Sequence, residues 1–250
     1  MSDAKNFDNM KNINETQQEG VRINKWIAES GYCSRREADR LIEEKKVTID
    51  GKTATLGDRV LPGMKVSVSG KLLGKHTSKV YIALNKPEGV VCTADAREPM
   101  NVVDYVGHTE RIFPIGRLDK DSTGLLLMTN DGEIVNRILR AGGKHEKEYV
   151  VTVNKPITAE FLQKMAEGVE ILDTVTLPCQ IYQETKTRFR IILIQGLNRQ
   201  IRRMCEALGY RVLALNRIRI MNIHLGRLKP GHWRNLTPME LEGLMNQLDD

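Results

Sequence analysis

The segment best suited to chemistry is 116–129, GRLDKDSTGLLLMT, in which a polar stretch bounded by glycine precedes a run of apolar residues. This order predicts a loop that enters a buried strand, and a loop presented by a rigid strand is a common setting for function. In the sequence, Asp119 lies between Arg117 and Lys120. These cations would keep its carboxylate ionised, so Asp119 is a candidate for catalysis.

A second carboxylate, Asp121, follows two residues later and is equally eligible on the same grounds. Two neighbouring carboxylates could serve a hydrolase as its acid and base. The common alternative for either residue is an aspartate that only hydrogen-bonds the next backbone amides of a turn. From the residues alone, both the choice between Asp119 and Asp121 and the kind of reaction stay open.

The elements around this loop mix strands and helices without a regular βα repeat, which indicates an α+β domain. We expect strands at 80–84, 125–128, 148–153 and 188–194, and helices at 131–139, 158–167 and 199–208. The helix at 199–208 has one apolar face, and Arg199, Arg202 and Arg203 are spread over the rest of its surface. Arg217 and Arg219 alternate along a later strand, which predicts that both face RNA from one side of that strand.

The N-terminal part of the chain predicts a tail and a small module. Residues 1–20 are rich in Asn, Gln, Asp and Glu, so we expect a flexible tail. Residues 21–76 predict two short helices followed by small strands, with a Ser34-x-x-Glu37 capping box at the second helix and a hairpin turn at 50–51. After a polar linker we expect the larger domain to span 79–245.

Composition narrows the class of protein only slightly. Among 250 residues, 38 Lys and Arg face 32 Asp and Glu, and the resulting charge of +6 favours an anionic partner without proving nucleic-acid binding. The four cysteines form no metal-ligand pattern, which indicates reduced thiols. We find neither an apolar run of bilayer-spanning length nor a signal pattern, so we expect a cytoplasmic monomer without a membrane association.

Basic residues gather in the small module and suit contacts with phosphate, because a helix N-terminus adds hydrogen-bond donors to their charges. The alternative is a solvated helix face whose cations pair with local glutamates. The candidate RNA-binding residues of this module are Arg22, Lys25, Ser34, Arg35 and Arg36.

Here a resemblance adds to the residues. The string RINKWIAESGYCSRREADRLI at 22–42, continued by VTIDG at 47–51, resembles the S4 RNA-binding domain. The match covers roughly fifty residues. The resemblance implies an αL-type fold and binding of structured RNA through its helical face.

The larger domain resembles the RsuA/RluA pseudouridine synthases. The segment at 116–130 is similar to their Arg-Leu-Asp signature with its Thr-Gly-Leu-Leu strand. Three further segments match in the expected order: LNKPEG at 84–89, KEY at 147–149 and NRQIRRM at 198–204. The resemblance implies a catalytic domain built on a mixed, largely antiparallel sheet.

Carried across position by position, the resemblance implies that Asp119 is the nucleophile. It implies that Tyr149 stacks on the flipped uracil and assists proton removal from C5, and that Arg202 pairs with Asp119. It further implies that Arg117 occupies the vacated RNA position or holds a phosphate. A carboxylate can attack C1′ or assist glycal formation, and the reaction needs neither a metal nor an organic cofactor.

Within the family, the segments HEKEY at 145–149, QGLNR at 195–199 and IMN at 220–222 are most similar to the RluF group. That group modifies a uridine of 23S ribosomal RNA near the peptidyl transferase centre, with transfer RNA as a possible second substrate. The alternatives are an RluB-like or RsuA-like enzyme acting on another uridine, and a non-catalytic S4 protein that binds the ribosome. A methyltransferase would need a glycine-rich nucleotide loop, and the sequence has no GxGxxG.

Overall fold

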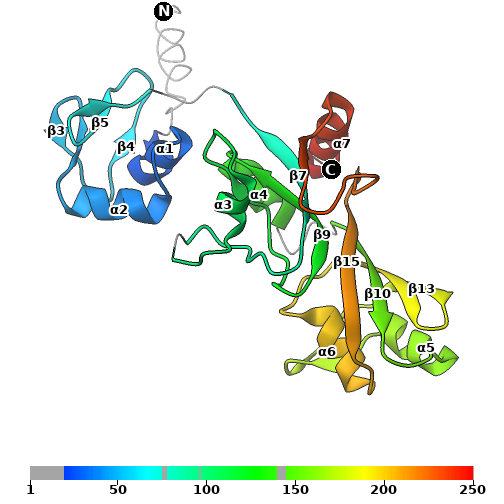
Figure 1. Ribbon diagram of the computed structural model, residues 1–250. Coiled ribbons are helices and arrows are strands. Elements are labelled where there is room, and N and C mark those ends of the chain that lie inside the picture. Colours follow the sequence, from blue (N-terminus) through cyan, green and yellow to red (C-terminus); the bar gives the residue numbers. More distant parts are fainter. Residues whose placement is uncertain (1–19, 75–77, 96, 140–144, 250) are drawn as a thin grey trace, which may run out of the picture. The chain divides into compact units, whose positions relative to one another are not determined.

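The computed structural model describes residues 20–74, 78–95, 97–139 and 145–249 (Figure 1). The chain divides between Thr77 and Ser78 into two compact units, here called the N-terminal unit and the C-terminal unit. The predicted tail at 1–20 lies outside the described residues except for Gly20. The carbonyl of Gly20 accepts a hydrogen bond of 2.7 Å from the Arg59 side chain.

The N-terminal unit packs two helices, α1 (Ile23–Glu29) and α2 (Arg35–Glu43), against short strands. Its four-stranded sheet has the order β3-β2-β5-β6, and β1 pairs with β4 beside it. These strands are β1 (Val21–Arg22), β2 (Val47–Ile49), β3 (Lys52–Thr53), β4 (Arg59–Val60), β5 (Val66–Val68) and β6 (Lys71–Leu72). The apolar residues that share one face of α1 and of α2 meet the inward side chains of the strands in one core.

The predicted start of α2 is confirmed, because the Ser34 hydroxyl accepts a hydrogen bond of 3.1 Å from the backbone amide of Glu37. The predicted hairpin is confirmed as well. Asp50 and Gly51 both have positive φ angles, 48° and 79°, as a tight turn between β2 and β3 requires.

The C-terminal unit is built on a large sheet that joins nine strands of the described chain in the order β13-β14-β10-β15-β9-β7-β17, with β16 on β15 and β8 on β9. Only the β15–β9 pair is parallel among these pairings, which confirms the mixed, largely antiparallel α+β fold. The strands of this sheet are β7 (Tyr81–Lys86), β8 (Phe113–Pro114), β9 (Thr123–Thr129), β10 (Lys147–Val153), β13 (Gln180–Thr185), β14 (Arg188–Leu193), β15 (Val212–Ile220), β16 (Ile223–His224) and β17 (Trp233–Asn235).

Helices cover this sheet, and a small hairpin, β11 (Glu170–Ile171) with β12 (Thr174–Val175), lies apart from it. The helices are α3 (Val102–Val106), α4 (Gly132–Leu139), α5 (Ala159–Glu167), α6 (Gln200–Ala207) and α7 (Pro238–Asp249). The predicted end of the domain at residue 245 is too early, because α7 continues to Asp249. Thr237 and Glu240 exchange backbone-to-side-chain hydrogen bonds of 2.9 and 3.2 Å, which is the capping box that begins this helix.

Strand β9 is buried on both of its faces, which explains its continuous apolar run. Leu125 and Leu127 pack into one apolar cluster, and Leu126 and Met128 pack into another on the opposite face. A strand covered on both sides needs apolar residues at every position rather than at alternate ones. The loop that ends in β9 is therefore anchored in the most buried part of the sheet.

Candidate active site

Asp119 lies on the loop between β8 and β9, and buried neighbours hold this loop on both sides. Leu118 packs into the apolar cluster beneath the loop, and its amide donates to the Cys92 Sγ at 3.3 Å. On the other side, the amide of buried Ser122 donates to the Asp119 carbonyl at 3.1 Å. The Asp119 side chain itself is 36% exposed, so a fixed backbone presents an accessible carboxylate.

Gly124 locks the end of this loop to β15. It pairs in parallel register with Arg217 and has a φ of +104°. A Cβ at this position would lie 2.2 Å from Asn216 Oδ1 and 2.3 Å from the Arg217 carbonyl oxygen. The glycine of the motif is therefore needed for the close approach of two strands rather than for chemistry.

The N-terminus of α6 brings arginines to the loop. The Arg199 Nη1 lies 3.4 Å from Asp119 Oδ2, and the two Nη atoms of Arg199 donate to the two carboxylate oxygens of Asp121 at 3.1 and 3.0 Å. Arg202 reaches the same loop, where its Nη2 donates to the Asp121 carbonyl at 2.8 Å and lies 3.4 Å from Asp121 Oδ2.

The predicted pairing of Arg202 with Asp119 is wrong in this structure. Among the ion pairs of the described residues, the one that involves Asp119 is with Arg199. Arg199 precedes the helix and reaches the carboxylate of Asp119, whereas Arg202 lies a turn further along and meets the loop at Asp121 and Ser122. Arg202 thus supports the backbone of the loop.

The two arginines keep Asp121 charged. The hydrogen bonds from Arg199 lower the pKa of the Asp121 carboxyl, and the charges of Arg202 and Arg199 lower it further against the opposing effect of burial. The same contact raises the pKa of Arg199. Asp121 is therefore an ionised partner of both arginines.

Tyr149 reaches the site through the sheet register. Tyr149 on β10 is opposite Arg217 on β15, and Arg217 is opposite Gly124 on β9. The partly buried Tyr149 ring packs against two apolar clusters, one of which contains Leu118. The tyrosine therefore stands where the two clusters meet, beside the residue that anchors the Asp119 loop.

The expectation that Arg217 and Arg219 face RNA is contradicted by their burial. Arg217 is 3% exposed, and its guanidinium donates to the carbonyls of Leu125 at 2.7 Å and Arg117 at 3.4 Å. Arg219 forms ion pairs with Glu148 at 2.6 Å and with Glu146 at 2.9 Å. These bonds hold both guanidinium groups inside the protein, although the buried Arg217 Nη2 itself has no hydrogen-bond partner among the described residues, so both arginines are structural.

Sequence reasoning missed Lys86. Its side chain is fully buried, and its Nζ donates to the carbonyls of Pro87 and Val90, both at 2.8 Å. Burial lowers the pKa of Lys86, and the nearby Cys92 thiol and the carboxylates of Asp121 and Asp119 oppose this shift. The segment LNKPEG matched the family as a strand, but nothing in its pattern indicated a buried ammonium group beside the catalytic loop.

The other candidate RNA-binding residues are divided between the two units. Arg117, Arg22, Arg35 and Arg36 are exposed. Lys25 lies 3.5 Å from Glu29 on the same helix, Arg203 donates to the Asn198 carbonyl at 3.1 Å, and Ser34 caps α2. Their contact with RNA stays a prediction.

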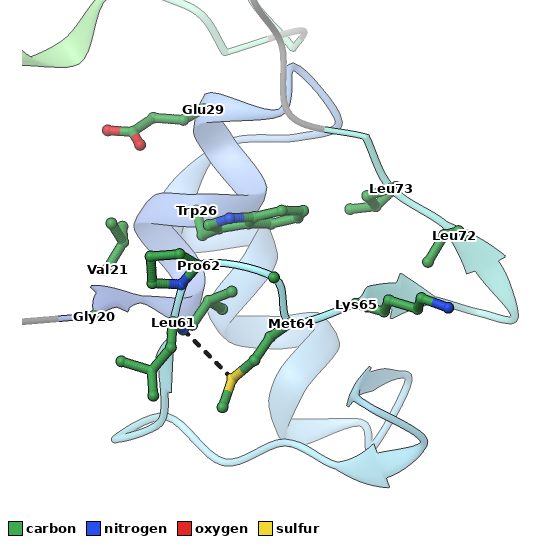
Figure 2. A pocket seen from close by; sticks show the side chains of 12 residues that line it. Gly20, Val21, Trp26, Glu29, Leu61, Pro62, Met64, Lys65, Leu72 and Leu73 are labelled. Carbon is green, nitrogen blue, oxygen red and sulfur yellow. Dashed lines mark hydrogen bonds between the residues drawn. The ribbon is translucent and has the colours of Figure 1, made fainter. Parts of the chain in front are cut away.

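A hollow in the N-terminal unit is distinct from this site (Figure 2). It is lined mainly by apolar groups, including the ring of Trp26 and the side chains of Leu61, Pro62 and Met64. None of the candidate catalytic residues lines it, and the residue types around it suit packing rather than catalysis.

Among the residues that the structure describes, no group of three or more His, Cys, Asp or Glu side chains is placed where it could hold a metal ion. No described helix combines the length and the apolar character that a membrane crossing requires.

Comparison with known proteins decides the family. The model of the RNA pseudouridylate synthase family matches residues 80–207, and the S4 domain model matches residues 21–66. The chain belongs to the RNA pseudouridylate synthase family. The synthase thus carries an S4 domain in its N-terminal unit, and its C-terminal unit holds the catalytic domain, as the resemblance implied.

Relatives of this synthase cover most of its length. It is 56% identical to the dual-specificity RNA pseudouridine synthase RluF of Escherichia coli strain K12. The match extends over 232 residues, which are 92% of this chain and 80% of the relative. It is 38% identical to the ribosomal large subunit pseudouridine synthase B of Bacillus subtilis, over 89% of this chain and 95% of the relative.

A solved crystal structure of a pseudouridylate synthase, 29% identical, superposes with a TM-score of 0.67 over 90% of this chain and 99% of its own. The chain is therefore an enzyme, which excludes the non-catalytic S4 protein, the hydrolase and the methyltransferase as alternatives.

Proposed function

We propose that this synthase converts a specific uridine of 23S ribosomal RNA, near the peptidyl transferase centre, into pseudouridine, with Asp119 as the nucleophile. The observation that carries the proposal is the setting of Asp119: an accessible carboxylate on a loop that is anchored on both sides, with an arginine 3.4 Å away. The match with a ribosomal large subunit synthase supports ribosomal RNA as the substrate. The words "dual-specificity" in the name of the RluF relative support a second substrate, which we propose is transfer RNA.

The chemistry explains why an aspartate is needed. The Asp119 carboxylate attacks C1′, the C1′–N1 bond breaks, and the uracil leaves with the bonding electrons. After the base turns, its C5 attacks C1′, the carboxylate is released, and the proton on C5 is lost. N1, which carried the bonding electrons away from C1′, takes up a proton from solvent in exchange for the one lost from C5, so the composition of the nucleoside is unchanged, as an isomerisation requires.

The other residues of the site have supporting roles in this proposal. The target base must leave its stack, which costs a few kcal/mol, and the ring of Tyr149 offers it an aromatic surface and assists the loss of the C5 proton. Arg199 places a positive charge 3.4 Å from the Asp119 carboxylate, and Arg202 holds the loop through the Asp121 carbonyl. Exposed Arg117, two residues before the nucleophile, is suited to fill the vacated RNA position or bind phosphate.

RNA binding outside the catalytic loop is assigned to the exposed cations of the S4 domain. Arg35 and Arg36 on α2 would contact phosphates, together with Lys25 on α1 and Arg22 on β1. Arg203 of α6 would add a phosphate contact in the catalytic domain. We propose a monomer that acts in the cytoplasm, where ribosomal RNA is available.

Covalent trapping tests the nucleophile. RNA that carries 5-fluorouridine at the target should form an adduct with the wild-type enzyme, detected by its shift on a denaturing gel, and Asp119→Asn should form none. Asp173→Asn is the matched control, because Asp173 lies at the β11–β12 turn and takes no part in the contacts of the Asp119 loop described above. Full pseudouridine formation by Asp119→Asn would show that another group is the nucleophile.

Mapping tests the substrate. Pseudouridines of 23S ribosomal RNA and of transfer RNA are compared between a strain with the enzyme and a strain without it. We expect a site near the peptidyl transferase centre to lose its pseudouridine in the deleted strain. A loss confined to 16S ribosomal RNA would favour the RsuA-like alternative.

A further inference from the structure

Two carboxylates compete for one guanidinium group at the catalytic loop. Arg199 directs both of its Nη atoms to Asp121, at 3.1 and 3.0 Å, and one of them also lies 3.4 Å from Asp119. We infer that Asp121 is a positioning residue that holds the Arg199 guanidinium off the nucleophile, so that Asp119 keeps an unobstructed oxygen for C1′. This inference rests on the proposed role of Asp119.

The geometry of the pairs favours Asp121. A guanidinium group that meets a carboxylate with two parallel N–H···O bonds forms a stronger pair than a single contact does. Because the two donors are already directed at Asp121, they cannot form a second such pair with Asp119. The contact with Asp119 remains single and longer, at 3.4 Å to Oδ2, and does not cover both of its oxygens.

Asp121 is itself fixed from a second side. The Arg202 Nη2 donates to its carbonyl at 2.8 Å, lies 3.4 Å from its Oδ2, and is 3.3 Å from the Ser122 hydroxyl. The Arg202 side chain is 14% exposed, so this support is shielded from solvent. Arg202 therefore holds the carboxylate in place, and that carboxylate holds Arg199.

The backbone directs Arg199 at this point. Arg199 has a φ of +49°, a left-handed conformation that residues other than glycine rarely adopt. The next residue, buried Gln200, holds the turn, because its amide donates to the Leu197 carbonyl at 3.2 Å and its side chain accepts from the Leu197 amide at 3.0 Å. The turn thus fixes the backbone position from which the Arg199 side chain extends. Asp121 then determines which carboxylate the guanidinium group binds.

Without Asp121, the same two donors would turn to the remaining carboxylate. A two-bond pair with Arg199 would cover both oxygens of Asp119, lower its nucleophilicity and block the approach of C1′. The chemical step should slow, while the affinity for RNA should stay unchanged or rise. Loss of a simple structural contact would not be relieved by removing Arg199 as well.

A double-mutant cycle tests this inference. The single-turnover rate of tritium release from RNA labelled at uridine C5 is measured with saturating enzyme for Asp121→Ala, Arg199→Gln and the double variant. We expect Asp121→Ala to be slower by roughly 10- to 100-fold, as displacement of a catalytic group commonly produces. The double variant should recover to within about threefold of Arg199→Gln alone, since the obstructing group is gone.

Further variants separate the possible outcomes. Asp121→Asn keeps the size of the side chain and therefore guards against misfolding of Asp121→Ala. Its single-turnover rate should fall between those of wild type and Asp121→Ala. Adding Arg199→Gln to Asp121→Asn should again restore the rate to near that of Arg199→Gln alone. Losses that simply add in the double variants would overturn this inference while leaving the nucleophile intact. Tritium release by Asp119→Asn would instead overturn the proposed nucleophile, and this inference with it.

Discussion

Arginines serve opposite purposes in the two units of this protein. On α2 of the N-terminal unit, Arg35 and Arg36 are exposed, and Arg40, whose side chain is 63% exposed, pairs with glutamates of the same helix. Beneath the catalytic loop, Arg217 is 3% exposed and bonds a carbonyl 92 residues away in the sequence.

The difference shows that solvent exposure decides what an arginine can do. An exposed guanidinium adds little to stability because water and salt screen its ion pairs, but it stays available to phosphate. A buried one must be satisfied within the protein, so it ties strands together and cannot turn to RNA. The exposed arginines of the N-terminal unit are therefore the ones we propose for RNA binding, whereas the catalytic domain uses several of its own to fix the loop of Asp119.

The largest effect on stability is expected from a glycine in the buried sheet of the C-terminal unit, compared with a glycine in an exposed turn of the N-terminal unit. Gly124→Ala should lower the free energy of unfolding of the C-terminal unit by about 3–5 kcal/mol, because the Cβ meets Asn216 and Arg217 and φ is positive. Gly51→Ala in the N-terminal unit meets nothing within 4 Å and should cost about 1–2 kcal/mol for its φ of +79° alone. Urea unfolding followed by tryptophan fluorescence measures both.

Each unit holds one tryptophan, Trp26 in the first and Trp233 in the second, so a Trp26→Phe background isolates the signal of the C-terminal unit. Equal losses for the two glycine variants would show that the close approach of β9 and β15 contributes nothing.

The next effect compares buried and exposed cations. Arg219→Met should destabilise the C-terminal unit by about 3 kcal/mol, since it leaves the largely buried carboxylate of Glu148 short of a partner. Arg36→Met on exposed α2 is the matched control and should change the unfolding free energy by less than about 0.5 kcal/mol. The midpoint of urea unfolding is the measurement, and similar shifts for both variants would remove the contrast.

An acid-dependent effect on stability is expected from the capping box of α7. The hydrogen bonds from Arg234, aided by Thr237, lower the pKa of Glu240 to about 2, against the opposing effect of burial. A lowered carboxyl pKa stabilises the fold above the unfolded value, here 4.5, and this stability is lost as pH falls toward about 2.

The thermal midpoint of the C-terminal unit should therefore fall less steeply over this pH window in Glu240→Gln than in the wild-type protein. Glu242→Gln removes an exposed carboxylate of the same helix and is the control for the change in charge. Parallel curves for Glu240→Gln and wild type would exclude this carboxylate as a source of acid sensitivity.

The smallest expected effect on stability comes from an exposed arginine of the S4 domain that we propose binds RNA. Arg36→Ala should leave unfolding unchanged and weaken RNA binding, with the slope of log affinity against log salt reduced by about one charge contact. Filter binding across a salt series measures the slope. An unchanged slope would remove Arg36 from the RNA footprint.

The sequence alone determined which segments form helices and strands, and it singled out Asp119 as the candidate nucleophile. The periodicity of 22–42 predicted α1 and α2, the apolar run of 125–128 predicted β9, and the motif around Asp119 indicated the family, because propensity, caps and motifs are properties of neighbouring residues.

Only the tertiary structure decided which groups meet. The parallel pairing of β15 with β9 turned Arg217 inward, and the left-handed turn at Arg199 brought that arginine, rather than Arg202, to Asp119. Lys86 became a buried cation near both carboxylates of the loop. The physical reason is that burial and ion pairing depend on contacts between strands and helices far apart in the chain, and no local pattern records those contacts.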